Sequence, residues 1–270
     1  MFKNTIRLFW WNEKIIQRKS KENYGDFLGK YLVEKISGKK VVFAWPKKFY
    51  FYDFFAPIYV TVGSILANVN NKCIVWGSGI INQQVLIKKA KFLAVRGPQT
   101  RKYLMGLGYE VPEVYGDPAL LLPRYFAPKV EKKYKYGIVP HYNDYKVVDK
   151  WFENRTDIHL IDLMTNDIES KTIEFLACEK IISSSLHGII VAHAYGIPAI
   201  WQKFSDKVFG DDIKFQDYME SVKLDFYLPI CRQIEFTEVE LKQLFENLPS
   251  LPKKQDMEDL RNSLMQVCPF

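Results

Sequence analysis

The sequence has few of the residues that build metal centres and disulfide frameworks. It contains only four histidines and four cysteines in 270 residues. The cysteines lie far apart, at Cys73, Cys178, Cys231 and Cys268. No Cys-x-x-Cys pair occurs, which argues against a zinc site and against a disulfide framework. We therefore expect free thiols, as in a reducing cytoplasm, and no bound metal.

Long hydrophobic runs are also lacking. The N-terminal residues contain no apolar stretch of signal-peptide length. The most apolar segment, Phe49–Val69, is interrupted by Asp53, Pro57 and Gly63. Because a membrane span needs ~20 predominantly apolar residues, we expect buried loop and strand there. The aromatic run Phe49–Phe55 leaves open a peripheral contact with the cytoplasmic face of a membrane.

Neither of the common nucleotide-binding motifs, Gly-x-Gly-x-x-Gly and the P-loop, is present. The short run Gly77-Ser78-Gly79 permits close approach of the backbone either to a ligand or to a neighbouring segment. The net charge is +7, and the basic residues form no stripe with interleaved aromatic residues. We therefore expect no nucleic acid partner. A small anionic substrate or an ordinary solvated surface would each account for the charge.

What the sequence does contain is a repeated alternation of short β-branched runs and amphipathic stretches. This alternation predicts an α/β protein with mostly parallel sheets. A proline and a charge run near Arg124–Tyr134 suggest a linker, so we predict two Rossmann-like domains, 1–125 and 126–270, facing each other across a cleft. The expected strands are 40–45, 59–63, 73–76, 91–95, 136–140, 158–163, 180–184 and 198–201. The main expected helices are 24–36, 98–107, 146–152, 166–177, 186–195, 215–222, 238–247 and 255–267.

Four polar motifs fall at the carboxyl ends of expected strands, where parallel sheets bind their ligands. They are Gly63-Ser64, Gly77-Ser78-Gly79, Arg96-Gly97 and the run Ser183 to Gly188. Their common position predicts one shared site.

The run Ser-Ser-Ser-Leu-His-Gly, residues 183–188, places His187 in the first turn of a helix. The amides and the dipole of a helix N-terminus favour an anion. Ser183, Ser184 or Ser185 can cap the helix or contact a phosphate directly. A protonated histidine beside a phosphate can act as a general acid. The alternative is a structural serine cap with a partly buried His187.

Arg96 is expected at the carboxyl end of a strand, beside a helix that begins at Pro98. A guanidinium there can bind phosphate or carboxylate in bidentate fashion. The alternative is a structural salt bridge, with Asp117 as the suggested partner. Asp117 itself can orient a cation, accept a substrate hydroxyl or cap the segment that follows it.

Three further residues are weaker candidates. His141 follows a strand and is expected at the mouth of the cleft. Lys214 can meet an anion, and Asp26 opens the first long helix. His193 is expected to be structural, because six residues after His187 it lies about 120° away on the same helix.

Taken together, these motifs resemble the polysaccharide pyruvyltransferase family. The resemblance runs from Asn23 to about Val222. The segments that carry it are Asn23–Asp26, Val62–Leu66, Val75–Ile81, Ala94–Thr100, Tyr115–Pro123, Ser183–Trp201 and Lys214–Tyr218.

The resemblance implies a fold like that of the GT-B glycosyltransferases. It also implies that phosphoenolpyruvate donates its carboxyethylidene group to two hydroxyls of one sugar, giving a pyruvate ketal and phosphate. The acceptor would be a cell-surface glycan, such as a capsule or exopolysaccharide, or its lipid-linked precursor. No cofactor is implied, and the location would be cytoplasmic. His187 would be the general acid. Donor-binding residues would be Arg96, Ser183, Ser184, Ser185, Leu186, Gly188 and Lys214. Further cleft residues would be Asp26, Gly63, Ser64, Gly77, Ser78, Gly79, Asp117 and His141.

One position departs from this pattern. Some family members carry an arginine two residues before the histidine, where this sequence has Ser185. Two alternatives therefore stay open. One is a GT-B glycosyltransferase that reads a nucleotide ribose with Glu174 or Asp206. The other is a non-catalytic relative.

Overall fold

A computed structural model describes residues 4–48, 51, 56–206 and 210–270 of the chain. Five parallel strands form a first sheet in the order β3-β1-β4-β5-β6. Its strands are β1 (Thr5–Phe9), β3 (Lys40–Phe43), β4 (Ile58–Val60), β5 (Cys73–Trp76) and β6 (Lys91–Ala94). Numbered by appearance within this sheet, the order is 2-1-3-4-5, that of a doubly wound fold.

A second parallel sheet has the order β11-β10-β7-β8. Its strands are β7 (Tyr134–Val139), β8 (Ile158–Leu160), β10 (Cys178–Ser183) and β11 (Ala199–Trp201). Successive residues of β10 point to opposite faces. Ile181 packs into one core and Ile182 into another. The two parallel sheets confirm the predicted α/β class, while the division into domains at residue 125 stays a prediction.

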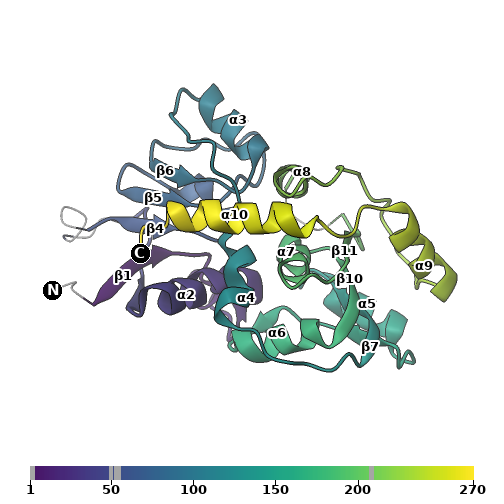
Figure 1. The fold of residues 1–270 in the computed structure, drawn as a ribbon. Helices are drawn as coiled ribbons and strands as arrows, with labels where there is room; N and C mark the ends of the chain where they lie inside the picture. Colours follow the sequence, from purple (N-terminus) through teal and green to yellow (C-terminus); the bar gives the residue numbers. More distant parts are fainter. Residues whose placement is uncertain (1–3, 49–50, 52–55, 207–209) are drawn as a thin grey trace.

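Helices cover both sheets (Figure 1). They are α1 (Glu13–Ile16), α2 (Tyr24–Ser37), α3 (Pro98–Gly106), α4 (Leu122–Tyr125), α5 (Tyr145–Phe152), α6 (Ile168–Leu176), α7 (Leu186–Ala194), α8 (Ile213–Ser221), α9 (Glu238–Asn247) and α10 (Lys254–Gln266). Two 3-10 helices, η2 (Leu66–Asn68) and η3 (Pro118–Leu121), and a two-stranded antiparallel pair, β2 (Glu22–Asn23) with β9 (Met164–Thr165), complete the described elements.

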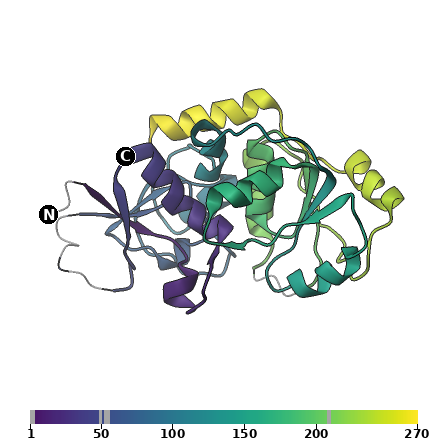
Figure 2. The ribbon, with the colours of Figure 1, turned by 90° about the horizontal axis from the view of Figure 1, so that it is seen from below.

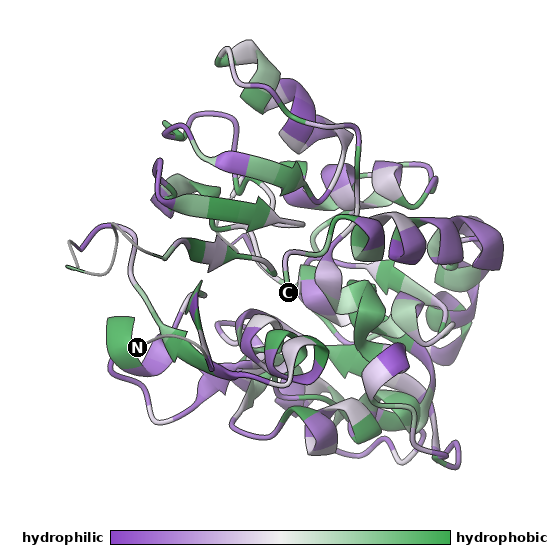
Figure 3. Ribbon diagram, turned by 60° about the vertical axis from the view of Figure 1, so that its left-hand side comes forward, coloured by the Kyte–Doolittle hydropathy of each residue, from purple (hydrophilic) through white to green (hydrophobic). Residues whose placement is uncertain are grey.

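Local sequence signals explain where these helices begin and end. Asn23 caps α2 by accepting a hydrogen bond from the Gly25 amide, and Gly38 ends the helix in a left-handed conformation. Pro98 stands at the first position of α3, where its missing N–H costs nothing. The hydrophobic strands lie inside the fold, and hydrophilic residues colour much of the outer helices (Figure 3).

One hydrophobic cluster joins the two halves of the chain. Leu28 and Leu32 of α2, from the first half of the chain, belong to the same buried cluster as Ile189 and Ile190 of α7. The last helix, α10, runs back across the molecule to the first sheet, as Figures 1 and 2 show. There the Trp76 indole donates a hydrogen bond to the carbonyl of Leu264 at 2.9 Å. These contacts connect the two halves of the chain.

Sequence reasoning did not anticipate β1, although it is an interior strand of the first sheet. Its residues, Thr-Ile-Arg-Leu-Phe, are largely buried. It pairs with β3 on one side and β4 on the other. Helix α8 also begins earlier than expected, at Ile213. The four cysteines form no disulfide with one another in the part of the chain that the structure describes. Except for Phe51, the aromatic run Phe49–Phe55 lies outside the described residues.

Candidate active site

Both sheets place their switch points at the same cavity. In the first sheet the strand order reverses between β1 and β4, and in the second between β7 and β10. Ligands of doubly wound sheets bind at such points, beyond the carboxyl ends of the strands. The segments that follow these four strands line one cavity of about 430 Å³. Its lining includes Trp11, Glu13, Gln17, Asn23, Asp26, Ser64, Ile65, His141, Tyr142, Asn143, Ser185, Leu186, His187 and Lys214.

His187 lies in the first turn of α7, and its side chain is mostly buried. Its Nε2 atom lies 3.6 Å from the Oδ2 atom of Asp117. Both atoms are buried, and neither has a hydrogen-bond partner among the described residues. The other carboxylate oxygen of Asp117 accepts a hydrogen bond from the amide of Ala119 and so caps η3. The pair is therefore held in place, while its two facing atoms keep unused hydrogen-bonding capacity. We call a pair of this kind unsaturated.

The start of α2 presses against the ring of His187. A Cβ atom on Gly25 would lie 2.2 Å from the Nδ1 atom of His187, so only glycine fits at this position. The motif Asn-Tyr-Gly-Asp thus supplies a helix cap at Asn23, a close approach at Gly25 and a cavity carboxylate at Asp26. Two helix N-termini, those of α2 and α7, meet at His187.

Charged groups around the cavity influence one another. Burial raises the pKa of Asp26 to about 7, and the nearby His187 and Lys214 partly oppose that rise. Burial lowers the pKa of Lys214 to about 8, and the positive charge of Arg96 lowers it further. The pKa of His141 falls to about 4 because of burial and the nearby Lys214. The cavity therefore holds groups that titrate near neutral pH.

Arg96 occupies a different place from the one expected of a donor-binding residue. It is fully buried and does not line the cavity. Its Nε donates to Asp217 at 2.9 Å, its Nη1 to Ser64 Oγ at 2.5 Å and its Nη2 to the Ile80 carbonyl at 2.8 Å. The suggested salt bridge to Asp117 is wrong, because the ion-pair partner is Asp217. Its contact with the cavity is indirect, because Ser64, which accepts its hydrogen bond, lines the cavity.

The three serines before His187 have separate positions. Ser183 is buried, and its hydroxyl binds the carbonyls of Val139 and Ser185. The hydroxyl of Ser184 accepts a hydrogen bond from the His141 amide at 2.8 Å. Ser185 is the N-cap of α7, but its side chain makes no capping hydrogen bond, and it lines the cavity. Of the three, Ser185 is the one placed to contact a ligand.

The glycine motifs serve the packing behind the cavity. A Cβ on Gly79 would lie 2.3 Å from the guanidinium carbon of Arg96, and one on Gly188 would lie 2.3 Å from Ser183 Oγ. Gly63 and Gly77 have positive φ angles, and Ser78 is buried with its hydroxyl on the Gly63 carbonyl. Leu186 is a largely buried residue that lines the cavity. The predicted cleft residues therefore fall into a cavity lining and a supporting layer.

Comparison with known proteins agrees with this arrangement. A family model for polysaccharide pyruvyl transferases matches residues 23–201. The chain belongs to the polysaccharide pyruvyl transferase family. It is also 34% identical over 238 residues to an uncharacterized protein of Acanthamoeba polyphaga mimivirus, a match that covers 85% of this chain and 81% of the relative.

The pyruvyl transferase match includes His187 and Asp117 but begins after Trp11, Glu13 and Gln17. Those three residues follow β1 and line the cavity. Sequence reasoning missed them together with Tyr142 and Asn143. The β-branched and aromatic content of Thr5–Phe9 is the signal that could have revealed β1, and with it the cavity residues that follow the strand.

His159, His193 and Glu174 lie outside this cavity, whereas His141 lines it. His193 is buried, with Nδ1 2.9 Å from the Tyr218 hydroxyl and Nε2 3.0 Å from the Ser250 carbonyl, as expected of a structural residue. Glu174 pairs with Lys171 and His159 and does not line the cavity. No observation here favours the nucleotide-sugar alternative.

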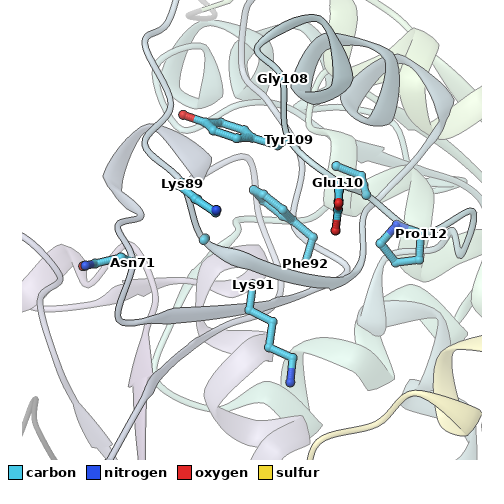
Figure 4. Close-up of a pocket in the computed structure, with 10 residues that line it drawn as sticks. Asn71, Lys89, Lys91, Phe92, Gly108, Tyr109, Glu110 and Pro112 are labelled. Carbon is cyan, nitrogen blue, oxygen red and sulfur yellow. The ribbon is translucent and has the colours of Figure 1, made fainter.

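A second cavity, of about 860 Å³, lies near the amino ends of β5 and β6, and Figure 4 shows the residues that line it. It is lined by residues at the start of β6, such as Lys91 and Phe92, and by the turn from Gly108 to Pro112. Because parallel sheets bind substrates at the carboxyl ends of their strands, the smaller cavity beside His187 is the candidate active site of this pyruvyl transferase.

Two features are absent from the part of the chain that the structure describes. No three histidine, cysteine or acidic side chains come together there in a metal-binding arrangement. Within those same residues, no helix has the length and apolar character needed to cross a membrane. The expectation that the reaction needs no cofactor stays a prediction.

Proposed function

We propose that this protein transfers the carboxyethylidene group of phosphoenolpyruvate to two hydroxyls of one sugar and releases phosphate. The observation that carries this proposal is the buried, unsaturated pair of His187 and Asp117 at the N-terminus of α7. A helix N-terminus favours the phosphate, and a histidine in its first turn can deliver a proton to the group attached to that phosphate. The family supplies the reaction class.

The donor binds where positive groups meet. Phosphoenolpyruvate carries about three negative charges near neutral pH. The first-turn amides of α7 lack acceptors within the helix. Lys214 and the hydroxyls of Ser64 and Ser185 line the cavity close to them in the fold. Arg96 acts as a positioning residue in this proposal, because its Nη1 holds the Ser64 hydroxyl.

His187 starts the reaction by protonating the methylene carbon of the donor. That carbon becomes a methyl group, and positive charge develops at the neighbouring carbon, C2. The negative charge of Asp117 stabilises the protonated ring before the transfer. A first sugar hydroxyl then adds to C2, and the C2–O bond to phosphate breaks.

The second hydroxyl of the same sugar closes the ketal at C2. The two hydroxyl protons are balanced by the new methyl hydrogen and by the proton on the released hydrogen phosphate. Asp26 lines the same cavity, and its pKa of about 7 lets it accept a hydroxyl proton and release it again at neutral pH.

Thermal unfolding with a panel of ligands tests the donor. Phosphoenolpyruvate at ~100 times its dissociation constant should add about 2.7 kcal/mol to the stability of the folded protein. We expect UDP, GDP and CMP to give no shift. Stabilisation by a nucleotide alone would overturn the proposal in favour of a glycosyltransferase, and no stabilisation by phosphoenolpyruvate would remove its basis.

The variant His187→Gln tests the general acid. It should release phosphate from phosphoenolpyruvate and a sugar acceptor roughly 10²–10⁴-fold more slowly than the wild type, the range that general acid catalysis supplies. Its melting temperature should stay close to that of the wild type, because glutamine fills much of the same space. Turnover at the wild-type rate would show that His187 is not the acid.

A further inference from the structure

One part of the cavity lining is not used by the donor chemistry above. Trp11, Glu13 and Gln17 contribute to it from the segment that follows β1. Tyr142 and Asn143 contribute to it from the connection between β7 and α5. These residues come from the same two switch points as the donor groups, so they face the space in which the reaction takes place.

The charge of this part of the lining suits a neutral ligand rather than the donor. Glu13 is almost completely buried, and its Oε2 atom lies 2.9 Å from the Lys19 ammonium group. Because the charges of this ion pair cancel, it offers little attraction to a phosphoenolpyruvate with about three negative charges. The carboxylate remains a strong acceptor for hydroxyl groups. We therefore expect these residues to contact a hydroxyl-rich substrate instead of the donor.

The remaining side chains fit a sugar ring. Trp11 is partly exposed and Tyr142 is more so, and both are on the cavity surface. An indole offers a large, rigid, apolar face with little loss of side-chain entropy, which suits the C–H face of a pyranose. Gln17 and Asn143 supply amide donors and acceptors for the hydroxyl groups around such a ring. A few polar groups on an apolar lining are typical of small-molecule sites.

A single lysine contacts residues from both segments of this part of the lining. The Nζ atom of Lys19 pairs with Glu13 and also lies 4.0 Å from the centre of the Tyr142 ring. A cation over an aromatic face is attracted to it. Lys19 thus links the segment after β1 to the segment after β7, and the opening is shaped before any ligand arrives.

From these observations we infer that the acceptor sugar binds between Trp11 and the Tyr142–Asn143 segment, with Trp11 as the platform for a pyranose ring and Glu13 as an acceptor for its hydroxyls. The inference rests on the proposed function and adds the position of the acceptor. Trp11 and Glu13 precede the residues matched by the family model, whereas Tyr142 and Asn143 lie within them.

Saturation-transfer NMR with a mixture of methyl pyranosides, of the galacto, gluco, manno and 2-acetamido types, tests the subsite directly. The spectra are recorded with and without phosphoenolpyruvate on the wild type and on Trp11→Ala, Trp11→Phe and Ile15→Ala. Ile15 is an exposed residue of α1, the short helix that follows Trp11, and does not line the cavity, so Ile15→Ala is the matched control. Stabilisation by phosphoenolpyruvate is measured on each protein in parallel.

We expect at least one pyranoside to bind the wild type. Trp11→Ala should weaken that binding by about tenfold or more, the scale of a loss at a central aromatic contact, while Trp11→Phe retains part of it and Ile15→Ala all of it. Phosphoenolpyruvate should stabilise all four proteins equally. Equal sugar binding by Trp11→Ala and the wild type would overturn the subsite even if the donor binds. Failure of every pyranoside to bind the wild type would overturn it too. Trp11-dependent sugar binding without any effect of phosphoenolpyruvate would support the subsite and contradict the proposed donor.

Discussion

Two buried pairs of a basic and an acidic side chain lie close to this cavity, and they differ in one respect. Arg96 and Asp217 are in contact at 2.9 Å, and Asp217 also accepts hydrogen bonds from the amide and the hydroxyl of Thr100. His187 and Asp117 stand 3.6 Å apart, and the facing atoms have no hydrogen-bond partner among the described residues. The first pair is saturated and the second is not.

This difference in hydrogen bonding indicates a structural role for the first pair and a role in the reaction for the second. A saturated buried ion pair cannot exchange a proton or accept a ligand without losing contacts that the fold depends on. An unsaturated pair costs folding free energy, and it keeps a titratable group available. Arg96 and His187 both come from motifs that the sequence predicts to bind the donor or act on it. Their hydrogen bonds, rather than their residue types, distinguish them.

The largest effect is expected from breaking the saturated pair. Arg96→Met leaves the Asp217 carboxylate buried without its partner, which should lower the free energy of unfolding by about 3–5 kcal/mol. Urea or thermal unfolding measures this loss. The control is Arg124→Met, because Arg124 pairs with Glu258 on the surface, where an ion pair contributes at most about 1 kcal/mol. Equal stability of the two variants would show that Arg96 does not hold the fold.

A smaller effect is expected from the unsaturated pair. In Asp117→Asn the amide oxygen can still cap η3, so stability should stay within about 1 kcal/mol of the wild type. Turnover should fall roughly ten- to hundredfold, because the protonated His187 loses a charged neighbour. Phosphate release at saturating donor measures it. A large loss of stability with normal turnover would reverse the contrast between the two pairs.

The smallest effect is expected at Lys214, which lines the cavity and whose pKa is lowered by burial and by the charge of Arg96 from the saturated pair. Lys214→Gln should weaken phosphoenolpyruvate binding about tenfold at pH 7, a loss of about 1.4 kcal/mol. The wild-type lysine is protonated below its pKa of about 8, so donor affinity should fall as the pH rises through that value. Lys214→Arg keeps its charge and should keep its affinity at pH 9. Titration of phosphoenolpyruvate at both pH values checks these outcomes, and a pH-independent wild type would contradict them.

Much of the fold follows from local signals that the sequence displays openly. The cap at Asn23, the glycine stop at Gly38 and the proline at the start of α3 each fix an element boundary by chemistry within a few residues. The missed strand β1 is different, because its position is decided by pairing with β3 and β4, which are distant in the sequence. The β-strand propensity of Thr5–Phe9 can be recognised in the sequence. The position of the strand between β3 and β4 cannot.

The site was predictable to a similar extent. The position of His187 at a helix start followed from the residues around it. That Arg96 faces Asp217 instead of a ligand depends on how α8 docks against α3, and no local pattern encodes that docking. The cavity positions of Trp11 and Glu13 depend on β1, so they were lost together with it.

The return of α10 to the first sheet has a consequence for how the protein is made. The Leu264 carbonyl accepts the hydrogen bond of the Trp76 indole, and the Leu264 side chain fills the space beside Gly116. When the ribosome has synthesised all strands of the first sheet, it has not yet synthesised the residues of α10 that cover Trp76 and Gly116. Trp76 and the residues around it therefore stay exposed to solvent until almost the entire remaining chain has been synthesised.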